Sequence, residues 1–495
     1  MTTLSRAGSF GAVLVLYLIS AVAIARTRVP WSNEAWAANP AATFAGRGYL
    51  GTPILASEGT WLRGIDRHTY WSMPLQPLLL GGWFLLFGVG LTQQLAFSIV
   101  CGAVSLAAAY AIGLALLRKY PHGEALAILP AALLTSHLPF LEAAANGRME
   151  MLCLTFGLSA YAAHFWSSRP WVSHAFAAAS IFVHPCGVLF AAGLVTLNLF
   201  ENGPRPAWPA IFKSALPYIL LSAGWAAYIA QAPADFRSQF LGNLSGFAGE
   251  YNGRTRVSGL SHPLQAMASE LRLRYLEPLG FNGIRPSARS ASFVFALALV
   301  LIAFVYRPLR SRSALLLPCL WILHAFILAI FEGMKFFNYL IFSSAILVAA
   351  GGVIAALWIG QRLVLWRILG YTVALLVLLG PFMTIRYAMR DTARPQYDRV
   401  AQFLETQPQG TEIAAPAEFA YRLGFEGRFR DDVRLGFLSH REPQVAVLGV
   451  WYRMWSQRSS ERDPALAAYY RQLLTQRLKL VFRAGDYEVY ARRQP

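Results

Sequence analysis

The chain has 495 residues, of which 56% are hydrophobic and only 14% are charged. This composition argues against a soluble globular protein and is typical of a polytopic membrane protein. The net charge of +18 comes with no nucleic-acid-binding motif, so we expect anionic lipids and phosphate-bearing substrates as partners, and no nucleic acid.

Residues 8–26 form the first apolar stretch, which is too long for a removable signal and lacks a small-residue cleavage pattern. We expect it to be a retained membrane anchor. Residues 31–36 (WSNEAW) follow it and place Glu34 between two tryptophans at a membrane interface. A carboxylate there can act as a general base on an acceptor hydroxyl or amine, although a solvated loop acid would have the same pattern.

Further apolar runs of spanning length follow along the chain. Residues 173–200 contain His184 and Pro185, where proline removes a backbone donor, so a pair of short helices is as plausible as one span. Residues 74–90 are short and flanked by proline, which favours an interfacial or re-entrant helix. The simple runs lie near residues 94–117, 124–141, 149–166, 211–230, 289–306, 313–331, 336–358 and 368–385.

The short loop at residues 307–312 (RPLRSR) is strongly basic and is therefore expected to be cytoplasmic. If residues 173–200 form a helical pair and residues 74–90 do not span, the chain has about eleven spans. The N-terminus is then cytoplasmic and the C-terminus periplasmic. This topology predicts a transmembrane domain, residues 1–389, with extracytoplasmic loops 27–93 and 232–288.

Residues 390–495 predict a small extracytoplasmic α/β domain. Its apolar patterns and turn signals indicate two helices, two short strands and a hairpin around Gly485. The helices are expected at residues 397–406 and 464–476, the strands at 412–415 and 444–448, and the hairpin at 478–482 with 487–492.

Polar residues at the outer ends of the spans are candidates for binding a phosphate-bearing substrate. Arg148 could bind phosphate with two donors, and Glu150 could orient that arginine or a metal, or the two could simply cap a helix as a pair. Arg67 and His68 could supply charge and a hydrogen bond, while Tyr70 could stack on a sugar. An ordinary aromatic belt would have the same composition.

Four more residues are candidates for binding a phosphate-bearing substrate. His184 and Lys335 are lone polar groups at helix ends, and a satisfied core histidine and a snorkelling lysine are the alternative interpretations. The long loop 232–288 adds arginines, among them Arg254 and Arg256, that could bind a phosphate.

Five short motifs follow one another along this hydropathy profile. They are Asn33-Glu34, residues 70–75 (YWSMPL), Arg148-Met149-Glu150, residues 184–187 (HPCG), and Lys335 with Tyr339. With them the chain resembles the GT-C integral-membrane glycosyltransferases, which include aminoarabinose transferases, protein O-mannosyltransferases and oligosaccharyltransferases. The resemblance covers nearly the whole chain.

The resemblance implies transfer of a sugar from a polyprenyl-phosphate-linked donor to an acceptor lipid, glycan or protein on the periplasmic face. It also implies a site that includes Tyr339. Asn33 stands where an Asp-Glu pair is common in the superfamily, which leaves Glu34 as the candidate base and puts a divalent cation at this loop in doubt. The four cysteines contain no CxxC pair, so a thiolate metal site has little support. No cofactor is certain, and a divalent cation remains open at this stage.

The main alternative is a transporter or flippase for an anionic lipid or small molecule, because intramembrane charges and broken helices also mark transport pathways. No inverted repeat is evident, and the charged candidates lie on one side of the predicted topology. The Ala- and Arg-rich composition favours a bacterial inner membrane. The sugar, the acceptor, the length of the prenyl chain and the oligomeric state are not determined by the sequence.

Overall fold

The computed structural model describes residues 3–203, 208–245, 259–280, 290–306, 311–359, 364–390 and 393–492. Arg254 and Arg256, two of the predicted binding residues, lie outside these residues. The chain forms two compact units. The helical unit contains residues 1–26, 95–224 and 256–389, and the α/β unit contains residues 27–94, 225–255 and 390–495.

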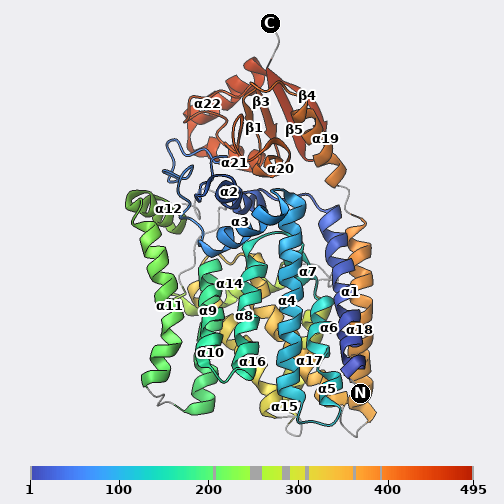
Figure 1. The fold of residues 1–495 in the computed structure, drawn as a ribbon. Coiled ribbons are helices and arrows are strands. Elements are labelled where there is room, and N and C mark those ends of the chain that lie inside the picture. The colour runs from blue at the N-terminus through green and yellow to red at the C-terminus, as the bar shows by residue number, and fades with distance from the viewer. Residues whose placement is uncertain are drawn as a thin grey trace. The chain divides into compact units, whose positions relative to one another are not determined.

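The helical unit consists of helices that run mostly along one another (Figure 1). At its centre, α17 (Ile341–Ile359) is buried over almost its entire length and packs against α6, α15, α16 and α18. This burial is expected for a helix that is hydrophobic on nearly every side. The other helices are α1 (Thr3–Thr27), α4 (Leu91–Leu117), α5 (Gly123–Leu126), α6 (Leu129–Thr135), α7 (Leu138–Ala144), α8 (Met149–Trp166), α9 (Pro170–Val183), α10 (Val188–Asn202), α11 (Trp208–Ile229), α14 (Pro263–Glu270), α15 (Ala291–Val305), α16 (Arg312–Phe331) and α18 (Val364–Ala388).

Within the described residues, five helices are long and apolar enough to cross a membrane, or six if one bent pair counts as a span. The five are Gly8–Thr27, Leu91–Leu117, Trp208–Ile229, Arg312–Phe331 and Phe337–Ile359. Shorter apolar helices, including α9, α10 and α15, accompany them. The predicted polytopic helical membrane fold is confirmed, while the number of about eleven spans stays a prediction.

The apolar run of spanning length at residues 124–141 forms a bent pair of helices, so its crossing of the membrane as one span stays a prediction. The segment bends by 73° between Thr135 and Leu138. Pro139 lies at the start of α7, and its ring would clash with the carbonyl four residues earlier if the helix continued. At the bend, the two ring nitrogens of His137 are 2.9 Å from the hydroxyls of Ser292 and Ser344.

Residues 173–200 form the expected pair of short helices. Helix α9 ends at Val183, a 3-10 turn covers Pro185–Gly187, and α10 begins at Val188. His184 caps this turn, since its Nδ1 accepts a hydrogen bond of 3.1 Å from the backbone N–H of Cys186. The turn passes so close to Ser180 and Ile181 that a Cβ at Gly187 would lie 2.3 Å from their backbone atoms.

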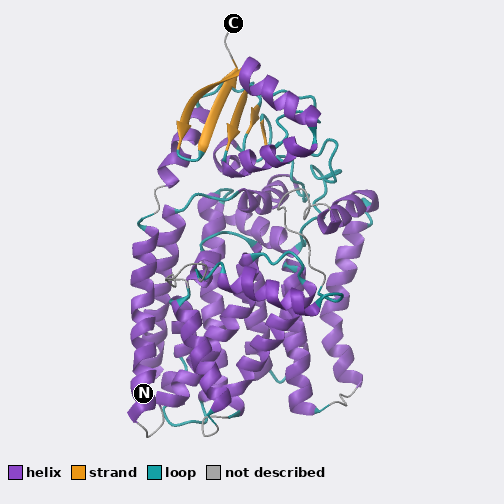
Figure 2. Cartoon of the chain, turned by 180° about the vertical axis from the view of Figure 1, so that it is seen from behind, coloured by secondary structure: helices purple, strands orange, loops and turns teal. Residues whose placement is uncertain are grey.

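The α/β unit contains a five-stranded sheet, the only sheet among the described residues, whose strands Figure 2 shows side by side. The strand order is β2-β1-β3-β5-β4, in which β1 is parallel to β2 and β3, and β5 is antiparallel to β3 and β4. The strands are β1 (Ile413–Ala414), β2 (Phe429–Arg430), β3 (Val445–Leu448), β4 (Leu478–Ala484) and β5 (Tyr487–Arg492). Every residue of β3 is buried, because alternate side chains enter two apolar clusters on opposite faces.

Helices cover this sheet and complete the α/β unit. In α19 (Ala393–Glu405) the buried residues Tyr397, Val400, Ala401 and Leu404 lie on one face at helical spacing. The predicted helices, strands and hairpin of the tail are confirmed, with boundaries shifted by a few residues. The remaining helices are α2 (Ser32–Arg47), α3 (Leu75–Phe87), α12 (Pro233–Ser245), α20 (Ala420–Leu423), α21 (Val450–Arg462) and α22 (Pro464–Gln472).

Candidate active site

Glu34 lies in the first turn of α2 and is fully buried, so the interpretation as a solvated loop acid is wrong. One carboxylate oxygen accepts a hydrogen bond of 3.1 Å from the backbone N–H of Trp31, the residue that precedes the helix. The other oxygen forms an ion pair with the guanidinium of Arg28. Glu34 therefore satisfies a backbone donor at the helix start and holds a counter-ion.

A short chain of hydrogen bonds links the Glu34 turn to the C-terminal part of the same unit. The amide nitrogen of Gln94 donates to the backbone oxygen of Glu34 at 3.0 Å. The hydroxyl of Tyr421 in turn donates to the amide oxygen of Gln94 at 2.7 Å. Burial of Tyr421 raises the pKa of its hydroxyl well above the usual value, so this group stays protonated and donates.

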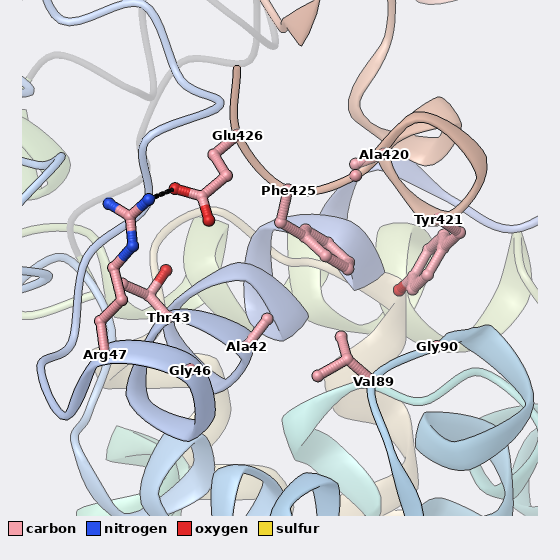
Figure 3. Close-up of a pocket in the computed structure, with 11 residues that line it drawn as sticks. Ala42, Thr43, Gly46, Arg47, Val89, Gly90, Ala420, Tyr421, Phe425 and Glu426 are labelled. Atoms are coloured by element: carbon pink, nitrogen blue, oxygen red, sulfur yellow. Dashed lines mark ion pairs between the residues drawn. The ribbon is translucent and has the colours of Figure 1, made fainter. Parts of the chain in front are cut away.

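Tyr421 also lines a pocket of about 320 Å³, which Figure 3 shows. The rings of Tyr421 and Phe425 meet edge to face with centroids 5.4 Å apart, and Arg47 and Glu426 form an ion pair at the rim. Aromatic and charged groups together suit a small polar ligand. The other lining residues are Ala42, Thr43, Gly46, Val89, Gly90, Ala420 and Gly424, and none of the predicted site residues is among the lining residues.

His68 and Tyr70 belong to an aromatic cluster in the α/β unit. Their rings stack with centroids 5.8 Å apart, and the hydroxyl of Tyr70 donates to the backbone oxygen of Tyr228 at 3.0 Å. His68 Nδ1 lies 3.6 Å from a carboxylate oxygen of Asp235. Arg67 differs, because its side chain is 81% exposed. Its ion pair with Asp66 is long, at 3.9 Å from Nε to the carboxylate oxygen.

In the helical unit, Arg148 and Glu150 form a buried pair at the start of α8. Arg148 Nη2 lies 2.6 Å from Glu150 Oε1, and the side chains are 9% and 1% exposed. Arg148 Nε and both Glu150 oxygens make no well-aligned hydrogen bond within the described residues. A buried polar group without a hydrogen bond is costly, so unfilled hydrogen-bonding capacity here points to a ligand position.

Two other predicted residues lie near this pair. The ring of His184 meets that of Tyr339 at 4.7 Å, nearly perpendicular, and His184 is within electrostatic range of Arg148. Tyr339 is within electrostatic range of both Arg148 and Glu150. The fold thus brings together residues that are up to 191 positions apart in the sequence. They come from the start of α8, the break after α9 and the 3-10 turn Phe337–Leu340 before α17.

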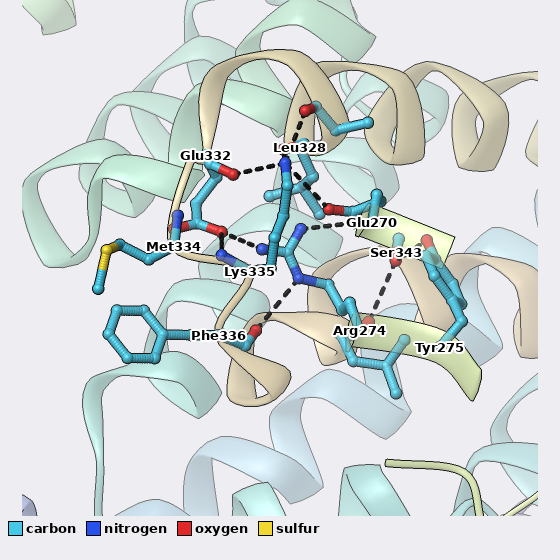
Figure 4. Close-up of polar contacts among 11 residues, drawn as sticks. Glu270, Arg274, Tyr275, Leu328, Glu332, Met334, Lys335, Phe336 and Ser343 are labelled. Carbon is cyan, nitrogen blue, oxygen red and sulfur yellow. Dashed lines mark hydrogen bonds and ion pairs between the residues drawn. The ribbon is translucent and has the colours of Figure 1, made fainter. Parts of the chain in front are cut away.

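Figure 4 shows a network of three buried charges and the partly buried Glu332, which is within electrostatic range of Tyr339. Arg274 is its centre and is fully buried, with Nη1 2.5 Å from Glu270, an ion pair to Glu332, and Nε donating to the backbone oxygen of Phe336 at 3.1 Å. Two acids and two bases, the fourth being Lys335, balance the charge. This balance offsets part of the cost of removing these groups from water.

Lys335 is 1% exposed, and its ammonium is already bound in this network. The nitrogen donates to the backbone oxygens of Leu328, Ala329 and Glu332, at 3.3, 2.6 and 2.6 Å, and lies 3.5 Å from Glu270. The three carbonyls belong to the end of α16, where a cation is favourable. A direct role in substrate binding stays a prediction, beside the capping role that these contacts support.

Sequence reasoning named Arg148, Glu150, His184, Lys335 and Tyr339 but missed several partners. The spacing of Glu270 and Arg274 by four positions is a local signal of a helical ion pair. Arg28, Gln94 and Tyr421 give no such signal, because their contacts join distant or irregular positions. Within the described residues, no three His, Cys, Asp or Glu side chains gather as a metal site would require.

No protein-family model matches the sequence, and no curated protein matches it. Among solved structures, ArnT from Cupriavidus metallidurans bound to undecaprenyl phosphate is similar, with a TM-score of 0.64 and 13% identity over 99% of this chain and 98% of that chain. The same protein in the apo state has a TM-score of 0.63 and 13% identity over 97% of both chains.

The Archaeoglobus fulgidus oligosaccharyltransferase in complex with Zn and sulfate is also similar, with a TM-score of 0.57 and 12% identity over 92% of this chain and 71% of that chain. At such identities the likeness concerns the fold. The fold extends over nearly all of the chain and of ArnT, including the C-terminal region. The chain therefore shares its fold with an aminoarabinose transferase and an oligosaccharyltransferase, two of the groups that its ordered motifs resemble.

Proposed function

We propose that this protein is a glycosyltransferase that moves a sugar from a polyprenyl-phosphate-linked donor to an acceptor at the periplasmic face of a bacterial inner membrane. The observation that carries the proposal is the match along 99% of the chain to an ArnT structure bound to undecaprenyl phosphate. Arg148 supports it independently, since its buried Nε–H makes no well-aligned hydrogen bond within the described residues and is a donor that suits an anionic group.

Arg148 is the residue that we propose for the donor phosphate. When the bond between the anomeric carbon and the phosphate oxygen breaks, negative charge builds on the phosphate. The guanidinium of Arg148 is buried and its Nε–H makes no well-aligned hydrogen bond to any residue that the structure describes. Because more charge lies on the phosphate in the transition state than in the bound substrate, this donor stabilises the transition state more and so accelerates the reaction. Glu150 would hold the guanidinium in place, and His184 and Tyr339 would border the site.

Glu34 is the general base in this proposal. It takes the proton of the acceptor hydroxyl or amine, whose electron pair forms the bond to the anomeric carbon while polyprenyl phosphate leaves. A displacement of this kind inverts the anomeric centre. Because Glu34 is paired with Arg28, the acceptor must come within about 2.6–3.2 Å of the carboxylate by sharing or displacing that guanidinium.

The test is transfer of radiolabelled sugar from a panel of polyprenyl-phosphate donors, with membranes that contain the wild type or Glu34→Gln. Glu405→Gln is the matched control, since Glu405 is an exposed acid of the same unit. We expect the wild type and the control to label one acceptor fraction, lipid, glycan or protein, and Glu34→Gln to lose that label. No label from any donor would contradict the proposed activity and favour a transporter or flippase.

A further inference from the structure

The helix that carries Glu34 is held by two buried carboxylates of the C-terminal region. The hydroxyl of Ser32 donates to the carboxylate of Glu418, and the indole N–H of Trp36 donates to Asp431 at 2.7 Å. Glu418 and Asp431 are 7% and 8% exposed. All four residues belong to the α/β unit, although nearly 400 positions separate the helix from its two partners.

A third contact continues the same face of α2. Asn39 is fully buried, its amide nitrogen donates to the backbone oxygen of Phe425 at 3.1 Å, and its amide oxygen accepts from the backbone N–H of Ile54 at 3.3 Å. Ser32, Trp36 and Asn39 are spaced by four and three positions, so they share one side of the helix. One stripe of α2 is thus fixed by polar contacts along the first half of the helix.

Glu34 points the other way. At about 100° per residue, its side chain is about 160° from those of Ser32 and Trp36 around the helix axis. Contacts on one side of α2 therefore set the position of an acid on the opposite side. A shift of the whole helix by about 1 Å would move a reacting group enough to cost a large factor in rate.

The two carboxylates are themselves anchored to the sheet and its helices. Tyr487 of β5 donates to Glu418 at 3.1 Å, and Tyr452 of α21 donates to Asp431. The side chains of α2 thus contact groups that the C-terminal fold already holds. This arrangement gives the C-terminal region a task in the reaction beyond its own stability.

We infer that Glu418 and Asp431 are positioning residues, which hold α2 so that Glu34 lies where the transfer reaction requires it. The expected effect on the transfer rate rests on the proposed function. The expected effect on the position of α2 does not. The acids do not touch the reacting groups; they act through the helix.

The test compares two double variants that remove equal numbers of hydrogen bonds to the same carboxylates. Ser32→Ala with Trp36→Phe removes the two bonds from α2, and Tyr452→Phe with Tyr487→Phe removes two bonds from the C-terminal fold. Two measurements are made on each purified protein. One is hydrogen exchange of the α2 backbone amides, and the other is kcat and KM for the donor and acceptor.

We expect the first variant to exchange its α2 amides about tenfold faster than the control and to lose at least about tenfold in kcat, with the donor KM within about twofold. Ser32→Thr, which keeps the hydroxyl, should retain the kcat of the wild type when Trp36 is intact. An α2 exchange rate in the first double variant equal to that of the wild type would overturn the inference. Faster exchange with unchanged kcat would overturn the positioning role as well.

The exchange measurement needs no activity, so it separates this inference from the proposed function. If the wild type uses no donor, the proposed function is contradicted, while hydrogen exchange still measures how firmly Ser32 and Trp36 fix α2. Thermal unfolding of both double variants checks that each is folded. If the double variant Ser32→Ala with Trp36→Phe does not fold, Trp36→Phe alone takes its place, and Tyr452→Phe is then the matched control.

Discussion

The guanidinium of Arg28 and the carboxylate of Glu34 form an ion pair across the first turn of α2, with side chains 14% and 0% exposed. The pair places a cation beside the acid that we propose as the base. A carboxyl group that is buried without a counter-ion is either protonated or carries a charge that is costly to bury, and a protonated carboxyl group cannot accept a proton. Arg28 thus supplies the counter-ion that the buried carboxylate of Glu34 requires.

Loss of Arg28 alone should cost more stability than loss of the whole pair. Arg28→Met leaves a buried carboxylate without its cation, and we expect the free energy of unfolding to fall by about 3–5 kcal/mol. Arg28→Met combined with Glu34→Gln should recover much of this loss, because no buried charge remains. Denaturant unfolding in detergent measures both, and an equal loss in the single and double variants would show that the pair is not coupled.

Arg148→Lys should weaken donor use while keeping the positive charge. Lysine cannot reproduce the flat, forked donor set of a guanidinium, so it loses a charge-assisted hydrogen bond worth about 1.5–3 kcal/mol. We expect kcat/KM for the donor to fall about 10- to 100-fold. Arg272→Lys is the control, since that arginine is 76% exposed. Similar kinetics for the two variants would remove Arg148 from the donor site.

Lys335→Met should act mainly on stability. The change leaves the carbonyls at the end of α16 without their cation and costs about 1–3 kcal/mol for each buried acceptor that finds no new partner. We expect a lower unfolding temperature than for Lys479→Met, an exposed lysine of β4. A donor KM raised as much as in Arg148→Lys, with stability unchanged, would instead support the binding role predicted from the sequence.

The stability of the α/β unit should depend on pH through Glu418. Burial is the main cause that raises the pKa of this carboxyl from 4.5 to about 7, with a smaller contribution from the nearby Asp431, while hydrogen bonds from Ser32 and Tyr487 lower it. Between these two values the folded state binds more protons than the unfolded state. Stability is therefore highest below pH 4.5 for this group and falls as the pH rises through about 7.

Glu418→Gln should remove that dependence, because glutamine does not titrate. We expect its unfolding temperature to change less between pH 5.5 and pH 8 than that of the wild type, in otherwise identical buffers. Asp431, whose pKa burial raises to about 6, adds a change of the same sign in both proteins. A wild type whose stability rises over this interval would contradict the argument.

Local patterns predicted much of the fold. Pro185 signalled the break between α9 and α10, because a missing backbone donor acts on the helix directly. Val445–Leu448 and the hairpin around Gly485 were recognisable from apolar runs and turn residues. Pro139 was harder, since proline is also common in the first turn of a helix and does not by itself mark a bend.

Long-range contacts could not be predicted in the same way. Helix α2 contains Pro40, which argues against a helix, and its burial in the α/β unit outweighs that local preference. The pair of Arg28 with Glu34 has no regular spacing, and the contact of Arg274 with Glu332 joins positions 58 apart. Such pairs depend on the complete fold, so the sequence identified candidate residues but not their partners.

The most direct test of the central claim is the single-turnover rate of sugar transfer by purified wild type and Glu34→Gln, with the donor that the label assay identifies. General base catalysis contributes about 10²- to 10⁴-fold, so we expect the rate to fall by that factor while the donor KM stays nearly constant. A Glu34→Gln rate within about threefold of the wild type would contradict the assignment of Glu34 as the base.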